Sequence, residues 1–88
     1  GESPAFDIQK SHRFPVGLID VRLNVAKGFI TEFKIYGDFF GSEDVEDIEK
    51  KLEGVKYREK EILETLNDIP LEVYFGKISQ EEFLTCII

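Results

Sequence analysis

Side chains able to act as a nucleophile, a general base or a zinc ligand are scarce in this sequence. It contains one histidine, His12, and one cysteine, Cys86. A nucleophile needs a base beside it, and a structural zinc site needs four ligands, so one residue of each type favours neither. We expect Cys86 to be an inert, apolar member of a C-terminal helix and His12 to be a satisfied or solvated strand residue. The sequence also has no phosphate-binding loop ending in Gly-Lys-Ser/Thr, so it predicts no catalytic, cofactor-binding or metal-binding residue.

Charged residues are more numerous, but their spacing is typical of a protein surface. Six acidic residues follow one another closely: Glu43, Asp44, Glu46, Asp47, Glu49 and Glu53. They lack the alternating ligands around a central glycine that a calcium loop needs, so they predict a solvated helix face. Arg13, Arg22 and Lys34 could form a small basic patch on an open sheet face, although ordinary surface charge is the favoured interpretation.

The most unusual segment is residues 37–41, Gly-Asp-Phe-Phe-Gly, which directly follows a predicted strand. Glycines supply turn conformations, and an Asp side chain can accept hydrogen bonds from local N–H groups, so the segment predicts an abrupt corner. Two consecutive aromatic residues cannot both point into one face of a sheet. We therefore expect one ring to fill the core and the other to be partly exposed and available to a partner surface.

The elements that position this corner begin with three strands, which alternating hydrophobic residues predict. Each strand has a set of residues on one face: Phe6 and Ile8, with His12 and Phe14 further along; Ile19, Val21, Leu23 and Val25; and Phe29, Phe33 and Ile35. Residues 15–17 join the first two strands. Between the second and third strands, a two-residue loop would place Leu23 opposite Glu32 and mix the faces. We therefore predict a three-residue loop, residues 26–28, that pairs Val25 with Phe29.

After residue 41 the hydrophobic period becomes helical. One helix is predicted from an N-cap at Ser42 to a stop at Gly54, and a second from about Arg58 to Asn67. A third begins at Ser79, which forms a capping box with Glu82, and residues 70–76 form a connector with a short helical turn. Strands followed by helices indicate an α+β domain, with two to three helices packed on one face of a three-stranded antiparallel sheet.

Length and charge limit the classes of partner. The 88 residues predict a single domain over residues 1–88. Eleven basic and 18 acidic residues leave a net charge of −7, all of it from residues 42–88. Because an acidic chain repels phosphates and no apolar run approaches the roughly 20 residues of a membrane helix, we expect no nucleic-acid or membrane partner. The single cysteine favours a reducing, cytoplasmic location, and a start at Gly1 suggests a removed leader or a piece of a longer polypeptide.

Residues 34–41, Lys-Ile-Tyr-Gly-Asp-Phe-Phe-Gly, resemble the KI-x-GDFF signature of the C-terminal accessory domain of bacterial lipoate–protein ligases. Other stretches resemble the same domain in the same order: residues 3–6, which begin Ser3-Pro4, and residues 14–30, 52–57 and 74–82. The resemblance covers nearly the whole chain. It implies three strands plus helices, in a fold akin to iron–sulfur assembly scaffold domains.

The resemblance also implies a function. Lipoate–protein ligases activate lipoate with ATP and Mg²⁺ to lipoyl-AMP and transfer the lipoyl group to a lysine of acceptor domains. Nucleotide, lipoate and catalytic lysine contacts belong chiefly to a larger N-terminal domain, which is absent from this sequence. The small domain swings between arrangements and supports activation more than transfer, so alone it is expected to be inactive and to bind no cofactor. Its expected partner is the catalytic domain, and Gly37, Asp38, Phe39 and Phe40 are the predicted interdomain docking residues.

Two alternatives stay open. The chain could be a separate small subunit of a split ligase that binds a catalytic chain in trans. It could also be a sulfur-transfer or iron–sulfur scaffold protein of the same fold. That last class needs a reactive cysteine on an exposed loop or a cysteine cluster, and Cys86 in a terminal helix meets neither requirement.

Overall fold

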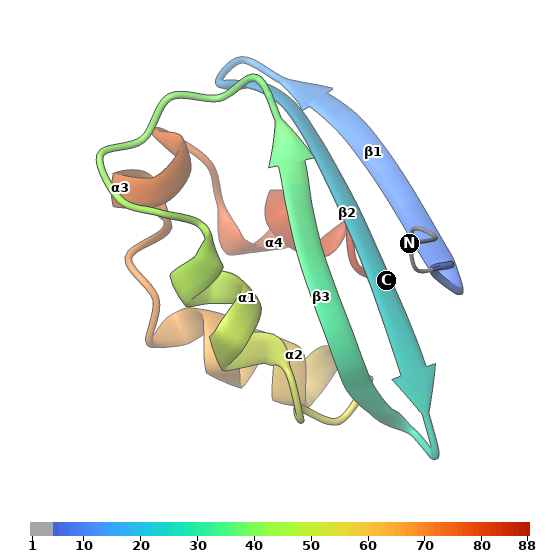
Figure 1. Cartoon of the computed structure of the whole chain (residues 1–88). Helices are drawn as coiled ribbons and strands as arrows, with labels where there is room; N and C mark the ends of the chain where they lie inside the picture. Colours follow the sequence, from blue (N-terminus) through green and yellow to red (C-terminus); the bar gives the residue numbers. More distant parts are fainter. Residues whose placement is uncertain (1–4) are drawn as a thin grey trace.

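A computed structural model of the chain describes residues 5–88 as a sheet covered on one face by helices (Figure 1). Gly1, Ser3 and Pro4 lie outside the described residues. The antiparallel sheet has the order β1-β2-β3, with bounds β1 (Ile8–Phe14), β2 (Gly17–Ala26) and β3 (Phe29–Gly37). The helices that follow are α1 (Glu46–Leu52), α2 (Glu59–Asn67), α3 (Leu71–Phe75) and α4 (Gln80–Leu84). This arrangement confirms the predicted α+β fold.

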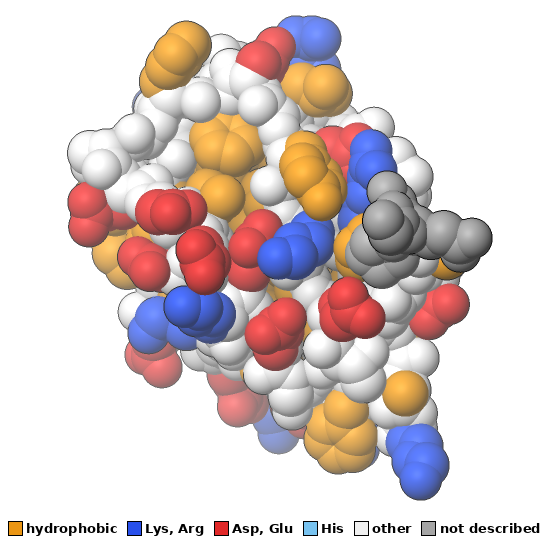
Figure 2. Space-filling view, viewed as in Figure 1, with side chains coloured by type: hydrophobic (Ala, Val, Ile, Leu, Met, Phe, Trp, Pro, Cys, Tyr) orange, Lys and Arg blue, Asp and Glu red, His pale blue; other side chains and the backbone are white. Residues whose placement is uncertain are grey.

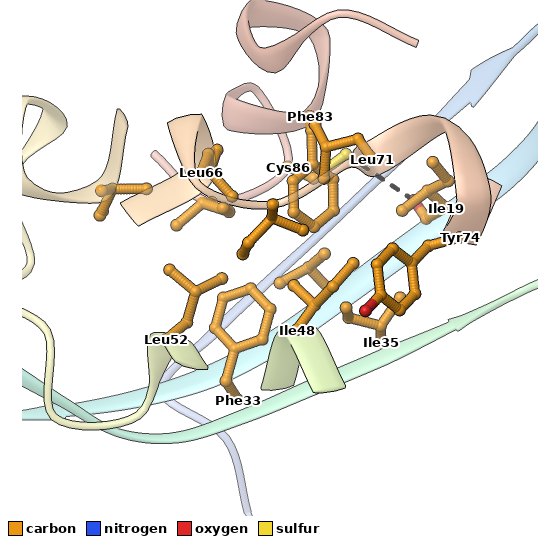
Figure 3. Close-up of a cluster of buried hydrophobic side chains, with 14 of the residues drawn as sticks. Ile19, Phe33, Ile35, Ile48, Leu52, Leu66, Leu71, Tyr74, Phe83 and Cys86 are labelled. Atoms are coloured by element: carbon orange, nitrogen blue, oxygen red, sulfur yellow. Dashed lines mark hydrogen bonds between the residues drawn. The ribbon is translucent and has the colours of Figure 1, made fainter. Parts of the chain in front are cut away.

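The core forms between the inward face of the sheet and the helices (Figure 3). Ile19, Val21 and Leu23 alternate along the central strand β2, and each is fully buried. Residues of the other elements pack on them, among them Phe33, Ile35, Ile48, Leu52, Ile62, Leu66, Phe75 and Phe83. Because side chains alternate along a strand, the residues between them on β2 face away from the helices and are polar.

The predicted loop of the β2–β3 hairpin is wrong. Ala26 pairs with Phe29, so the loop has two residues, Lys27 and Gly28, whose φ angles of 54° and 84° suit a two-residue hairpin turn. The register then shifts between Asn24, which pairs with Glu32, and Val25, which pairs with Ile30. One extra residue, Thr31, is accommodated there, and its hydroxyl donates to the Asn24 carbonyl over 3.2 Å.

This β-bulge explains why the prediction failed. The expected register assumed an unbroken series of strand pairs. Because side chains alternate between the two faces, a two-residue loop would then mix core and surface residues on one face. A bulge resets the alternation, so Ile30 and Phe33 both face the core although three positions separate them. Phe29, which was expected to face inward, is instead 48% exposed. The β1–β2 loop is likewise one residue shorter than predicted, because Phe14 pairs with Gly17.

The predicted start of the first helix is also wrong. Helix α1 begins at Glu46 rather than after Ser42, and the Asp44 carboxylate accepts the Glu46 N–H over 2.9 Å. Ser42 is used elsewhere, since its N–H donates to the Val73 carbonyl over 2.9 Å. A tertiary contact with α3 therefore displaces the expected N-cap.

The later helices agree with the sequence. Helix α2 begins directly after Arg58, and α3 forms the predicted short helical turn. The capping box of α4 is present: the Ser79 hydroxyl accepts the Glu82 N–H over 3.0 Å, and the Glu82 carboxylate accepts the Ser79 N–H over 2.9 Å. No helix among residues 5–88 is long and apolar enough to span a membrane.

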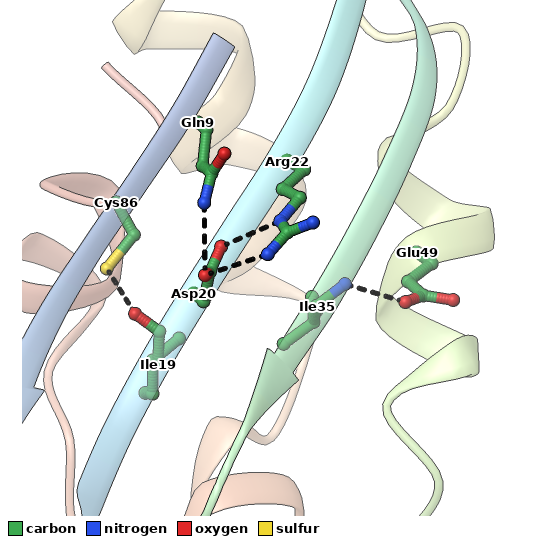
Figure 4. A network of polar contacts seen from close by, with 7 residues as sticks. All are labelled: Gln9, Ile19, Asp20, Arg22, Ile35, Glu49 and Cys86. Carbon is green, nitrogen blue, oxygen red and sulfur yellow. Dashed lines mark hydrogen bonds and ion pairs between the residues drawn. The ribbon is translucent and has the colours of Figure 1, made fainter. Parts of the chain in front are cut away.

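Glu49 does not belong to the solvated acidic face on which it was predicted. Its side chain turns from α1 toward β3, and the residue is only 8% exposed. The Glu49 carboxylate accepts the Ile35 N–H over 2.8 Å (Figure 4). The same carboxylate lies 3.9 Å from the Lys34 ammonium. Because Ile35 lies on an edge strand, this carboxylate pairs a backbone donor that the sheet leaves free.

The loop between α1 and α2 covers a second part of the same edge. The Gly54 N–H donates to the Ile30 carbonyl over 2.7 Å, and the Ile30 N–H donates to the Val55 carbonyl over 2.8 Å. The Tyr57 N–H also donates to the strand edge, to the Gly28 carbonyl over 2.9 Å. Together with Glu49, this segment closes much of the β3 edge against pairing with another strand.

Replacing Glu49 by Ala should destabilise the protein by about 2 kcal/mol, because the Ile35 N–H loses its acceptor in a buried place. The matched control is Glu46→Ala on the same helix. Glu46 forms an exposed ion pair with Lys50, so the control should change the free energy of unfolding by less than about 0.5 kcal/mol. Denaturant unfolding of both variants measures the difference, and equal losses would contradict the role assigned to Glu49.

Candidate docking surface at the corner loop

The corner loop, residues 37–41, joins β3 to the segment before α1 and passes α3 on its way (Figure 1). All four predicted docking residues lie in it. Its first part is tied to the start of β2, where the Asp38 carboxylate accepts the Leu18 N–H over 2.6 Å and the Asp38 N–H donates to the Leu18 carbonyl over 3.2 Å. Asp38 bonds backbone groups, but its partner Leu18 precedes it by 20 residues, so a tertiary contact with β2 takes the place of the local contacts that were predicted.

Two glycines allow the loop to approach its neighbours closely. A Cβ on Gly37 would lie 2.0 Å from the Leu18 carbonyl oxygen. A Cβ on Gly41 would lie 1.9 Å from the Tyr74 carbonyl oxygen, which belongs to α3. Any side chain at either position would force the backbone apart, so glycine is needed for contact rather than for flexibility.

Phe39 is the ring that enters the core. It is half-buried, and its centroid lies 4.8 Å from that of Phe75 in an edge-on arrangement. The Phe75 ring in turn lies 5.0 Å from that of Phe83. This aromatic row joins the corner loop to α3 and to α4, and such contacts add to the stabilisation from burial alone.

The far end of the loop is bound to α3. The N–H groups of Ser42 and Glu43 both donate to the Val73 carbonyl, over 2.9 Å and 3.1 Å. The neighbouring Tyr74 hydroxyl donates to the Asp47 carboxylate over 3.1 Å and so links α3 to α1. The corner loop is therefore fixed at its beginning, its middle and its end.

Phe40 is the exception, because it is 92% exposed. The structure thus separates the two consecutive aromatic residues as expected, one inward and one outward. Figure 2 shows hydrophobic side chains at the upper end of the molecule, where the loop after β3 lies, and acidic side chains beside them around the start of α1. The loop displays one aromatic ring at the border of an acidic surface.

The basic residues that could have formed a patch are each near a carboxylate. Arg22 lies 3.3 Å from Asp20 on its own strand (Figure 4). Its guanidinium also lies over the Tyr36 ring, 5.0 Å from the ring centre. Lys34 approaches Glu49, and Arg13 lies 4.0 Å from Asp38. Each of these cations thus has a carboxylate within 4.0 Å, which agrees with the interpretation as ordinary surface charge.

The two residues considered for nucleophilic chemistry have opposite surroundings. His12 is exposed on β1, whereas Cys86 is fully buried in the turn after α4, two positions beyond Leu84, and not in the C-terminal helix in which it was expected. The Cys86 thiol lies 3.9 Å from the Ile19 carbonyl oxygen, and burial raises the pKa of this thiol. A raised thiol pKa lowers the fraction of reactive thiolate. Residues 5–88 contain no group of three or more His, Cys, Asp or Glu side chains placed to hold a metal ion.

Sequence reasoning missed one surface feature at the other end of the sheet. Phe29 and Val55 line a shallow pocket together with Lys56, Glu61, Glu64, Thr65 and Asp68. Arg58 holds the pKa of Glu61 at about 2 through a charged hydrogen bond. The bulge that turns Phe29 outward creates this pocket, and an alternating pattern gives no signal for it.

Fold and loop together define a small α+β domain that presents an exposed aromatic ring beside a group of acidic residues. Residues 3–87 match the family model described as the C-terminus of bacterial lipoate protein ligase, and the chain belongs to this family. The residues that carried the sequence resemblance thus lie in a matched region that covers almost the whole chain.

Individual relatives agree with the family model. The lipoate-protein ligase LplJ of Bacillus subtilis is 47% identical over 87 residues, which are 99% of this chain and 26% of the relative. A lipoate–protein ligase of Streptococcus pyogenes is 39% identical over 93% of this chain and 24% of its own length. Lipoate–protein ligase 2 of Staphylococcus aureus is 32% identical over 100% and 26%. The chain therefore spans about a quarter of the length of the curated relatives it matches.

Substitution of the two aromatic residues should have unequal effects on stability. Phe39→Ala removes a ring packed on Phe75 and should cost about 2 kcal/mol. Phe40→Ala should change the free energy of unfolding by less than about 0.5 kcal/mol, because an exposed ring loses little on truncation. Thermal or denaturant unfolding of each single variant measures this, and a large loss for Phe40→Ala would show that its ring packs on this domain.

The Cys86 thiol should react with a thiol-specific reagent only after unfolding, because it is buried and its pKa is raised. Native protein should be labelled orders of magnitude more slowly than protein in guanidinium chloride. Fast labelling of the folded protein would revive the sulfur-transfer alternative.

Proposed function

We propose that this chain is the non-catalytic accessory domain of a lipoate–protein ligase and supports activation of lipoate before its transfer. The observation that carries the proposal is the match of residues 3–87 to the C-terminus of this ligase family, within only about a quarter of each relative. A segment of this size beside a much larger remainder is suited to covering and positioning a site that the remainder provides.

The reaction has two steps. A lipoate carboxylate oxygen attacks the α-phosphorus of ATP and displaces pyrophosphate, which gives lipoyl-AMP. The amine of an acceptor lysine then attacks the lipoyl carbonyl carbon, displaces AMP and loses a proton as the amide forms. Lipoyl-AMP is a mixed anhydride that water hydrolyses, so a domain that closes over it protects the product of the first step.

The side chains of this domain support an auxiliary role. Cys86 is buried and its thiol pKa is raised, and the Glu49 carboxylate accepts a hydrogen bond from the Ile35 N–H. Both side chains therefore serve the fold. As the family resemblance implies, we assign ATP, Mg²⁺ and lipoate to the remainder of the enzyme. The proposal includes a cytoplasmic location and docking through Gly37, Asp38, Phe39 and Phe40. On this proposal the protein that carries the acceptor lysine binds to the complete ligase and not to this domain alone.

The test compares the full-length ligase with a version that lacks this domain. Deletion should lower the rate of lipoyl-AMP formation by about 100-fold, the scale at which misplaced reacting groups slow catalysis. Transfer from supplied lipoyl-AMP to an acceptor protein should fall by less than about tenfold, because the adenylate is already formed. Unchanged activation, or a larger loss in transfer than in activation, would refute the proposal.

The same experiment addresses a domain that acts in trans. If adding the separate domain to the shortened enzyme restores activation, the covalent connection is dispensable. The reading frame upstream of the Gly1 codon then decides which arrangement is native. A frame that continues through a catalytic domain places the two parts in cis, whereas a start codon near Gly1 indicates a split ligase.

A further inference from the structure

Phe40 combines high exposure with a fixed backbone. Its side chain is 92% exposed, yet the residues around it are held by Leu18, by Phe75 and by the backbone of α3. Burial of a large aromatic side chain is favourable, so a ring left in water gains free energy when it inserts into a partner surface. Here Phe39 occupies the inward position, and the backbone on either side of the two rings lies close to the Leu18 and Tyr74 carbonyls at Gly37 and Gly41.

A rigid, exposed aromatic residue is well suited to anchor a protein contact. Binding energy at interfaces is concentrated in a few residues, aromatic ones prominent among them, that insert into pockets of the partner. An anchor that is already ordered loses little conformational freedom on binding. The hydrogen bonds of Asp38 and Ser42 hold the loop in one arrangement before any partner arrives.

The surroundings of Phe40 define the chemistry of the complementary surface. Four exposed acidic residues follow it closely: Glu43, Asp44, Glu46 and Asp47. On the other side lies the exposed Asp38, and α3 adds the exposed Glu72. Figure 2 shows acidic side chains next to the loop around the start of α1. A partner that buries Phe40 therefore needs an apolar pocket with lysine or arginine at its rim.

We infer that Phe40 is the anchor by which this domain docks on the remainder of the same ligase chain, in an apolar pocket with a basic rim. The inference rests on the proposed function. The remainder of the ligase is chosen as the docking partner because of the relatives. In them, the region that matches this chain covers 24–26% of the protein, and the rest lies outside the match. Within the proposed docking segment, Gly37 and Phe39, together with Gly41, position the anchor, and Asp38 adds a negative charge beside it.

The full-length ligase with Phe40→Ala tests the anchor. Lipoyl-AMP formation should fall by at least about tenfold, as for the truncation of an interface hot spot, with no change in melting temperature. The matched control is Phe29→Ala, which removes another exposed phenylalanine at the far end of β3. It should leave activation within about twofold of the unmodified enzyme. Equal rates for Phe40→Ala and Phe29→Ala would overturn the inference.

A charge reversal tests the rim. Glu43→Lys places a positive charge beside the anchor and should lower lipoyl-AMP formation severalfold, with a smaller effect at high salt. Glu64→Lys on α2 is the control with the same charge change, and it should have no comparable effect. If Glu43→Lys activates the enzyme or matches its control, the rim is not basic and the assignment fails.

Photo-crosslinking identifies the partner directly. With p-benzoylphenylalanine in place of Phe40, irradiation of the full-length enzyme should join position 40 to a peptide of the same chain outside residues 1–88. The same amino acid in place of Phe29 should give no such product. A crosslink to a second copy of the enzyme, or none at position 40, would overturn the inference.

The domain deletion separates the two proposals. If deletion abolishes activation but Phe40→Ala does not, the accessory function stands and the anchor is refuted. If deletion leaves activation unchanged, the accessory function itself is refuted.

Discussion

The close contact between the corner loop and α3 is the constraint on which the rest of the structure depends. A three-stranded sheet buries only one face, so the chain must turn sharply after β3 and return its helices over that face. The turn is possible because Gly41 lies against the Tyr74 carbonyl and the N–H groups of Ser42 and Glu43 share the Val73 carbonyl. The same contacts that close the core also hold Phe40 in water.

Phe39 and Phe40 show how identical side chains acquire opposite roles. Phe39 contributes to the aromatic row with Phe75 and Phe83, so packing of its ring stabilises the folded domain. Phe40 is 92% exposed among the residues that the structure describes, so its ring is available to another surface. The corner loop thus joins the sheet to the helices, and the proposed docking contact would use the same loop.

The free edge of β3 is covered by contacts other than those that bury its inward face. Glu49 accepts the Ile35 N–H, and the loop before α2 pairs with Gly28 and Ile30. These contacts make an exposed edge unavailable to other strands, which is a common protection against aggregation. Contact with the rest of the ligase is accordingly proposed at the end of the sheet, where an ordered side chain projects, and not along its edge.

The sequence by itself determined the fold class, the capping box at Ser79 and the division of Phe39 and Phe40 into an inward and an outward ring. These features follow from local periodicity and short-range hydrogen bonds. Only the tertiary structure decided the hairpin register, the start of α1 and the burial of Glu49. Thr31 enters a bulge, Ser42 bonds to Val73, and Glu49 finds an unpaired N–H on β3. Each outcome depends on a partner distant in sequence or on a break in periodicity, and neither is visible in a local pattern.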